Sequence, residues 1–158
     1  ESMAVANVPL PPFASPSDLE AAGAIPVIRR QNIEFQLLGD LSAAVLKKRH
    51  YVAAPGRVVA FDFFRRTAGG GAGAGGSTSV DLLLNGVTVL STLAAVTQAS
   101  GANQKATTKA ILSTAHAAWD GHGIKLAVGD YIEVQITAID AGATAPADMF
   151  ALVDLLAG

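Results

Sequence analysis

The dipeptide Asn85-Gly86 constrains the fold of this chain more than any other feature of its sequence. It separates two apolar runs, residues 80–84 and 87–90, and both of its residues accept the positive φ angles of a two-residue hairpin turn. The sequence therefore predicts an antiparallel β-hairpin at this position.

The remainder of the chain from Ile33 onward follows the same pattern. Short apolar runs rich in β-branched residues alternate with turn residues, which is typical of an all-β domain. In residues 131–139, the apolar side chains of Ile132, Val134 and Ile136 occupy every second position, so one face of this strand is expected to be buried. Predicted strands cover residues 33–38, 43–53, 57–66, 79–84, 87–93, 105–113, 124–127, 131–139 and 148–156. We expect a single all-β domain over residues 33–158.

Two regions depart from this pattern. Residues 69–76 contain six glycines and two alanines, which predicts a mobile loop that contributes nothing to stability. Residues 94–123 alternate small and polar side chains. Within them, residues 105–118 fit either a strand or a helix, because Ala and Lys favour the helix.

Residues 1–32 hold five of the seven prolines of the chain. Proline fixes φ and removes a backbone donor, so this stretch is expected to be an extended arm rather than a helix or a central strand. Large apolar side chains recur between the prolines and predict that the arm docks on a neighbouring subunit or on a shell. The expected contact residues are Val8, Leu10, Phe13, Leu19 and Ile25.

The composition favours association between copies. Charged residues make up 15% of the 158, well below the roughly 25% of an average soluble domain, so an isolated monomer would expose unusually apolar faces. Asp81 and Asn85 interrupt the longest apolar run, and no membrane span or membrane partner is expected. The chain contains no cysteine, which excludes disulfides and thiol chemistry.

No motif in the sequence predicts an enzyme. A Ser nucleophile elbow, a recognisable triad order and a paired-carboxylate arrangement are all missing. The glycines Gly71, Gly73 and Gly76 match a nucleotide-binding spacing, but a hairpin strand follows them instead of a helix. His116, Asp120 and His122 match no known metal-ligand spacing. We expect no catalytic residue, no cofactor and no bound metal.

Residues 41–66 carry a band of six basic side chains: Lys47, Lys48, Arg49, Arg57, Arg65 and Arg66. On a strand, successive side chains point to opposite faces, so this charge is scattered, and the net charge of the chain is −2. A solvated strand edge or ion pairs between subunits fit the band better than a nucleic-acid surface. We expect no direct contact with nucleic acid.

Three segments taken together resemble a known family: residues 48–58, ending in the turn Ala54-Pro55-Gly56, the hairpin at residues 80–89, and residues 126–134 with the Gly129-Asp130 turn. Their order and spacing are similar to those of jelly-roll virion proteins of tailed bacteriophages, which include head decoration (cement) proteins and head or tail fibre domains with a tumour-necrosis-factor-like sandwich. The resemblance implies an antiparallel β-sandwich of jelly-roll type, preceded here by the extended N-terminal arm.

The resemblance also implies a function. The chain would be a non-enzymatic structural protein of the virion, assembled in the host cytoplasm, that binds the major capsid protein as a homotrimer and stabilises the head. The alternative is a receptor- or glycan-binding domain of a phage fibre or spike. In that case, loops at one end of the sandwich would carry the ligand, with Asn103, Trp119, Asp120 and His122 as candidate contacts.

Overall fold

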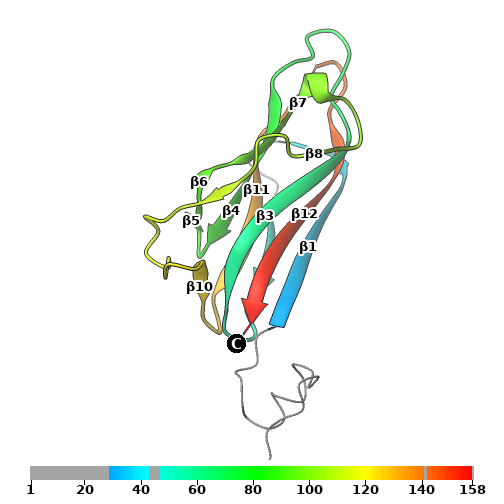
Figure 1. Ribbon diagram of the computed structural model, residues 1–158. Coiled ribbons are helices and arrows are strands. Elements are labelled where there is room, and N and C mark those ends of the chain that lie inside the picture. Colours follow the sequence, from blue (N-terminus) through cyan, green and yellow to red (C-terminus); the bar gives the residue numbers. More distant parts are fainter. Residues whose placement is uncertain (1–28, 43–46, 141, 158) are drawn as a thin grey trace, which may run out of the picture.

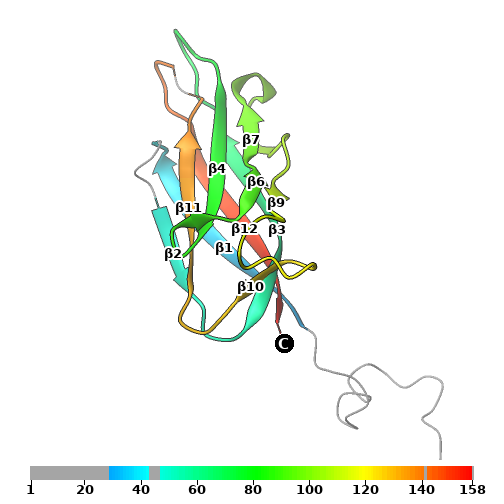
Figure 2. The same cartoon turned by 90° about the vertical axis from the view of Figure 1, so that its left-hand side faces the viewer.

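The computed structural model describes residues 29–42, 47–140 and 142–157. Within these ranges the regular secondary structure is almost entirely β-strand, and the strands form antiparallel sheets that pack face to face (Figures 1 and 2). The predicted all-β sandwich is therefore confirmed. In the described residues, no helix is long and apolar enough to span a membrane.

Two sheets form the sandwich. The first has the strand order β1 (Arg29–Asp40), β12 (Ala147–Ala157), β3 (Gly56–Thr67) and β10 (Ile124–Leu126), and β8 (Gln104–Lys105) also pairs with β3. The second has the order β2 (Lys47–Tyr51), β11 (Tyr131–Ala138), β4 (Ser77–Leu84) and β5 (Val87–Thr88), and β7 (Ala94–Thr97) also pairs with β4. A separate pair joins β6 (Leu90–Thr92) to β9 (Ile111–Leu112), and a short 3-10 helix, η2 (Gln98–Ser100), follows β7.

The hairpin between β4 and β5 forms as predicted. Asn85 and Gly86 both have positive φ angles, 50° and 86°. The Asn85 side chain also joins this turn to the one before β11: its amide donates to Asp130 Oδ1 at 3.0 Å, and its oxygen accepts from the Tyr131 N–H at 3.0 Å. Asp130 in turn accepts from the Ala127 N–H at 2.8 Å. One side chain thus links two turns that are far apart in sequence.

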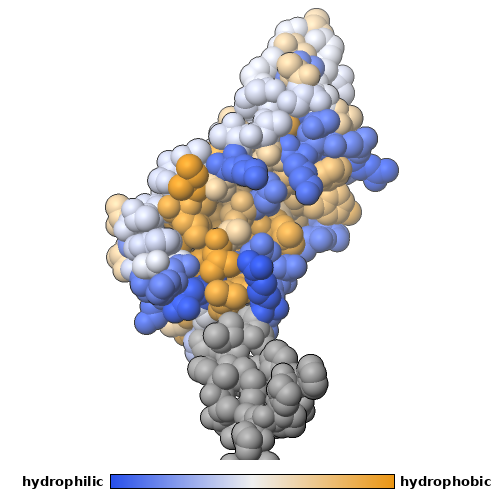
Figure 3. All heavy atoms as spheres, viewed as in Figure 1, coloured by the Kyte–Doolittle hydropathy of each residue, from blue (hydrophilic) through white to orange (hydrophobic). Residues whose placement is uncertain are grey.

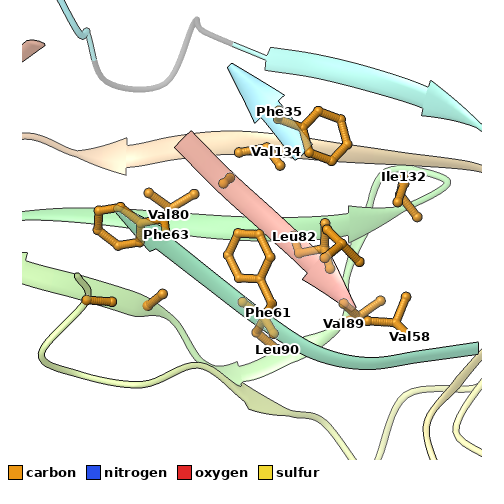
Figure 4. Close-up of a cluster of buried hydrophobic side chains, with 14 of the residues drawn as sticks. Phe35, Val58, Phe61, Phe63, Val80, Leu82, Val89, Leu90, Ile132 and Val134 are labelled. Carbon is orange, nitrogen blue, oxygen red and sulfur yellow. The ribbon is translucent and has the colours of Figure 1, made fainter. Parts of the chain in front are cut away.

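The core lies between the two sheets, because alternate residues of every long strand point inward. Each sheet contributes a layer of aliphatic and aromatic side chains (Figure 4), and the predicted inward residues Ile132, Val134 and Ile136 are all buried. The largest contributors from the first sheet are Phe35, Phe61, Phe63, Met149 and Val153, and those from the second are Val80, Leu82, Ile132, Val134 and Ile136.

The ends of two predicted segments differ from the structure. Strand β1 begins at Arg29, and residues 29–32, which were expected to belong to the arm, pair with residues 154–157 of β12. Residues 105–118 are neither a continuous strand nor a helix: β8 and β9 pair briefly, Thr108 forms a single bridge with Ala95, and the rest is irregular. Their small and polar side chains have no apolar period that would bury one face.

The glycine-rich loop at residues 69–76 makes more contacts than expected. The backbone of Gly70 exchanges two hydrogen bonds with Thr144, at 3.0 and 2.9 Å, and the Ala143 N–H donates to the Ala72 carbonyl at 3.1 Å. The approach is close enough that a Cβ on Gly71 would lie 2.8 Å from the Ala143 Cβ. The mobility of the loop and its contribution to stability stay predictions, but its backbone is joined to residues 143 and 144 by hydrogen bonds that the sequence did not predict.

An ion pair lies inside the same end of the sandwich. Alternation along β3 points Phe61, Phe63 and then Arg65 inward, so the arginine is completely buried. Its Nη1 lies 2.5 Å from Asp140 Oδ1, and its Nη2 donates to the Gly101 carbonyl at 2.8 Å. The buried charge of Arg65 is thus balanced within the fold.

Asp140 connects this ion pair to its surroundings. Its carboxylate accepts hydrogen bonds from the Thr78 hydroxyl on β4 and, at 3.1 Å, from the Gly69 N–H at the start of the glycine-rich loop. Arg65 and Asp140 together therefore join β3, β4, the glycine-rich loop and the turn after η2 at one end of the sandwich.

Candidate interaction surface

The outer face of the first sheet carries aromatic side chains. Alternation on β3 and β12 points Phe64, Phe150 and Leu152 away from the core, and Phe64 and Phe150 are register partners. Their ring centroids are 6.4 Å apart with the planes tilted by 44°, a favourable arrangement for an aromatic pair. Phe64 and Phe150 are half-buried, and Leu152 is 37% exposed. We call these three residues and their surroundings the aromatic face.

Two shallow depressions lie on and beside the aromatic face. The first, of about 220 Å³, lies over Phe64 and Phe150 and is bordered by Glu34 and Lys105. The second, of about 610 Å³, lies between β3 and β9, where Ile111 is 56% exposed and Trp119 forms part of the wall. Asp62 lines both, so they adjoin one another. The space-filling view shows apolar surface gathered on this side of the molecule (Figure 3).

Charged side chains surround the depressions. Glu34, Asp62 and Asp154 lie on the β1, β3 and β12 side, and Lys105 and Lys109 lie on the segment that runs from β8 to β9. Among the described residues, none of these five takes part in an ion pair. An apolar centre with a charged border is the arrangement found in protein–protein contacts.

The loop at residues 113–123 contains three of the predicted ligand residues. Trp119 is half-buried and packs against the core. Asp120 organises the loop: its Oδ2 accepts from Arg57 at 2.7 and 3.0 Å, and its Oδ1 accepts from the His122 and Gly123 N–H groups at 2.9 and 3.1 Å. These hydrogen bonds lower the pKa of the Asp120 carboxyl, and the bond from the His122 N–H has the largest effect. Both of its oxygens thus already have partners, one on β3 and the other in the loop.

Asn103 does not join the other three predicted ligand residues. Its N–H bonds the carbonyl of Arg66, near the end of β3, whereas Asp120 pairs with Arg57 near the start. Nine residues of strand separate these positions, or about 30 Å at about 3.3 Å per residue. The glycine-rich loop lies at the Asn103 end too, so the expectation of one shared loop cluster is wrong.

Of the two histidines of this region, one bonds a nearby backbone group and the other has an exposed side chain. His116 Nδ1 accepts a hydrogen bond from the Ala118 N–H at 3.0 Å, and the side chain of His122 is exposed. No group of three or more His, Asp or Glu side chains that could hold a metal ion occurs in the described ranges.

The basic band divides into paired and solvated members. Arg49 contacts Glu133 at 3.1 Å and lies 4.0 Å from the centre of the Tyr131 ring, and Arg57 and Arg65 pair with Asp120 and Asp140. These ion pairs are formed within the chain, not between subunits. The side chains of Lys47, Lys48 and Arg66 are exposed. Half of the band thus stabilises the fold.

The contact residues predicted for the arm lie outside the described residues; they are Val8, Leu10, Phe13, Leu19 and Ile25.

The aromatic face is the surface that sequence reasoning missed. The sequence of β3 contains the signal for this face: Phe61, Phe63 and Arg65 alternate with Asp62, Phe64 and Arg66. A strand with aromatic residues on both faces must either expose the aromatics of one face or cover them with a partner.

Acid is expected to destabilise the fold through the turn carboxylates. Hydrogen bonds, first from the Asn85 amide and then from the Ala127 N–H, lower the pKa of Asp130 in the folded protein. The folded state therefore binds this proton less readily than the unfolded chain, whose carboxyl titrates near about 4. The stabilisation is complete above about pH 4 and is lost as the pH falls through the lower, folded pKa. Urea unfolding across this range should give a shallower pH dependence for Asp130→Asn.

Asp81 provides the contrast for that experiment. Burial raises the pKa of its carboxyl, so its ionisation opposes folding as the pH rises, which is the reverse sign. Asp81→Asn should therefore still lose stability as the pH falls. If the free energy of unfolding of Asp130→Asn falls with pH as steeply as that of the unchanged chain, the role given to Asp130 is contradicted.

Comparison of the chain with protein-family models, curated proteins and solved structures gives no match.

Proposed function

We propose that this chain is a capsid decoration protein of a tailed bacteriophage, which binds the head as a homotrimer and docks through its N-terminal arm. The observation that carries the proposal is the aromatic face. Phe64, Phe150 and Leu152 lie on the outside of a sheet, where a monomer in water would be expected to place polar side chains. A protein that works within an assembly covers such a face with a neighbour.

Two further features support this function. The eight longest-paired strands divide into two four-stranded sheets with the first and last strands side by side, an arrangement compatible with a jelly roll. The arm of apolar residues and prolines leads directly into β1 at one end of the sandwich. The binding segment is thus attached at a single rigid point, while the sandwich acts as the brace.

Binding to shells tests this function. The purified full chain should saturate empty heads of the virus that encodes it, and electron microscopy of those heads should show added density at regular lattice positions. Phe13→Ala should bind about 30-fold more weakly or worse, because removal of a central aromatic anchor costs at least about 2 kcal/mol.

The control for this experiment is Val128→Ala, which changes a side chain that is 65% exposed in the turn before β11. It should bind as the unchanged chain does. Failure of the full chain to bind heads, together with specific binding on a glycan array, would instead assign the protein to receptor or glycan recognition.

A further inference from the structure

The aromatic face has the shape and chemistry to bind a proline-rich peptide. Its first depression is formed by the rings of Phe64 and Phe150 with Leu152 beside them, and the second contains Ile111 and the indole of Trp119. Aromatic-lined shallow grooves are the usual receptors for segments in the polyproline II conformation, which dock at low entropic cost because prolines already restrict them.

Such a segment occurs in the chain itself. Residues 8–13 read Val8-Pro9-Leu10-Pro11-Pro12-Phe13, with two prolines between Leu10 and Phe13 and a Pro-x-x-Pro spacing from Pro9 to Pro12. In polyproline II, residues three apart lie on the same face, about 9 Å from one another. Leu10 and Phe13 would therefore present one apolar edge.

This spacing falls within the extent of the depressions. They adjoin at Asp62, and Phe64 in the first and Ala60 in the second are four residues apart along β3, or about 13 Å. Two anchors about 9 Å apart fit within this distance, one on each side of Asp62. Resting on the proposed assembly, we infer that the aromatic face binds residues 8–13 of a second copy of this chain.

Charge sets the orientation of this occupant. Residues 1–28 contain Glu1, Asp18 and Glu20 and no basic residue. The depressions carry Lys105 and Lys109 on the side from β8 to β9, and Glu34, Asp62 and Asp154 on the side of β1, β3 and β12. The acidic positions that follow the proline-rich segment can pair with the lysines only if they lie toward the β8 and β9 side. Opposite charges at the border of an interface fix the orientation of the partner.

The position of β1 favours a second copy over the same chain. Arg29 pairs with Ala157, seven residues along β12 from Phe150, and β1 runs from there toward the aromatic face, so docking within one chain would require a reversal of the chain before Arg29. Fifteen residues lie between Phe13 and Arg29, and the sixteen Cα steps from one to the other span up to about 55 Å when extended. This length reaches a neighbouring molecule without a reversal of the chain.

A mixing experiment with full-length variants tests the inference. Leu10→Ser/Phe13→Ser keeps the face and removes the anchors, and Phe150→Ser/Leu152→Ser keeps the anchors and removes the face. Each alone should sediment as a monomer at micromolar concentration, whereas the unchanged chain associates. A mixture of the two should form a heterodimer, because one intact arm and one intact face remain. A mixture that stays monomeric would overturn the inference.

The matched control is Val87→Ser/Val128→Ser, which removes two side chains that are 58% and 65% exposed on other surfaces. It should associate as the unchanged chain does. Loss of association in this control as well would show that general surface apolarity, rather than the aromatic face, drives assembly.

A peptide titration gives a second measurement that does not depend on the face variant. A synthetic peptide of residues 4–28, added to the Leu10→Ser/Phe13→Ser chain, should change the emission of Trp119, the single tryptophan of the protein. A Pro11→Gly/Pro12→Gly peptide should bind about 4- to 30-fold more weakly, since each proline restricts the free peptide. Equal affinity of the two peptides, or no binding, would contradict docking in a polyproline conformation.

The results separate the inference from the proposed function. A chain that exchanges arms in solution but does not bind heads would refute the decoration function alone. A Phe150→Ser/Leu152→Ser chain that associates and binds heads as well as the unchanged chain would refute the inference alone.

Discussion

Replacement of Asp140 by asparagine is expected to lower the free energy of unfolding by about 3–5 kcal/mol, because it leaves the buried charge of Arg65 without a counterion. Both side chains of the pair are completely buried, so water cannot take the place of the carboxylate. Asparagine keeps one oxygen that can accept from the Gly69 N–H, while its amide nitrogen replaces the oxygen that faces Arg65. Urea unfolding at neutral pH measures the loss.

Two variants serve as comparisons for this result. The double change Arg65→Met/Asp140→Asn removes both charges and should recover most of the stability. Glu133→Gln should cost only about 1 kcal/mol or less, because its partner Arg49 has a side chain that is 43% exposed and remains hydrated. A loss below about 1 kcal/mol in Asp140→Asn would show that Arg65 reaches solvent.

Gly123→Ala is expected to destabilise the protein by about 1–3 kcal/mol, since there is no room for a side chain. A Cβ at this position would lie 2.4 Å from the Val58 carbonyl oxygen, which belongs to the backbone of β3 and cannot rotate away. The clash would push β10 from its pairing with β3, where Ile124 and Val58 are register partners. The melting temperature gives a direct measurement.

Gly75→Ala is the matched control, because it adds the same methyl group at a glycine with nothing within 4 Å of the new atom and no positive φ. It should leave the melting temperature unchanged or raise it slightly, since alanine restricts the unfolded chain. Equal melting temperatures for the two variants would mean that β10 can shift relative to β3 without loss of stability.

Local sequence chemistry predicted the regular half of the fold. Asn85-Gly86 specifies its turn through backbone angles, and the alternation of Ile132, Val134 and Ile136 specifies which face of β11 is buried. Both signals act between residues that are close in sequence. The segment around β8 and β9 has no such signal, because its short pairings depend on what lies beside it in space.

The interaction surface illustrates the same limit. The sequence predicts Asp120 as a polar ligand residue of a loop, yet Arg57, which is 63 positions away in sequence, binds its carboxylate. The inward position of Arg65 follows from the alternation in β3, but its partner Asp140 is 75 positions away, after the eight strands β4 to β11. A single sequence carries no record of such pairings.

The last strand of the chain lies in the middle of the first sheet, between β1 and β3. During synthesis, β1 emerges from the ribosome early and has no neighbour in its sheet until residues 147–157 follow, and β3 lacks its longest pairing until then. The sandwich therefore cannot close before residues 147–157 have left the ribosome, and until then nascent chains expose the unpaired edges of β1 and β3 to one another. This order of events makes folding dependent on slow, non-local pairing, during which extended apolar segments stay exposed.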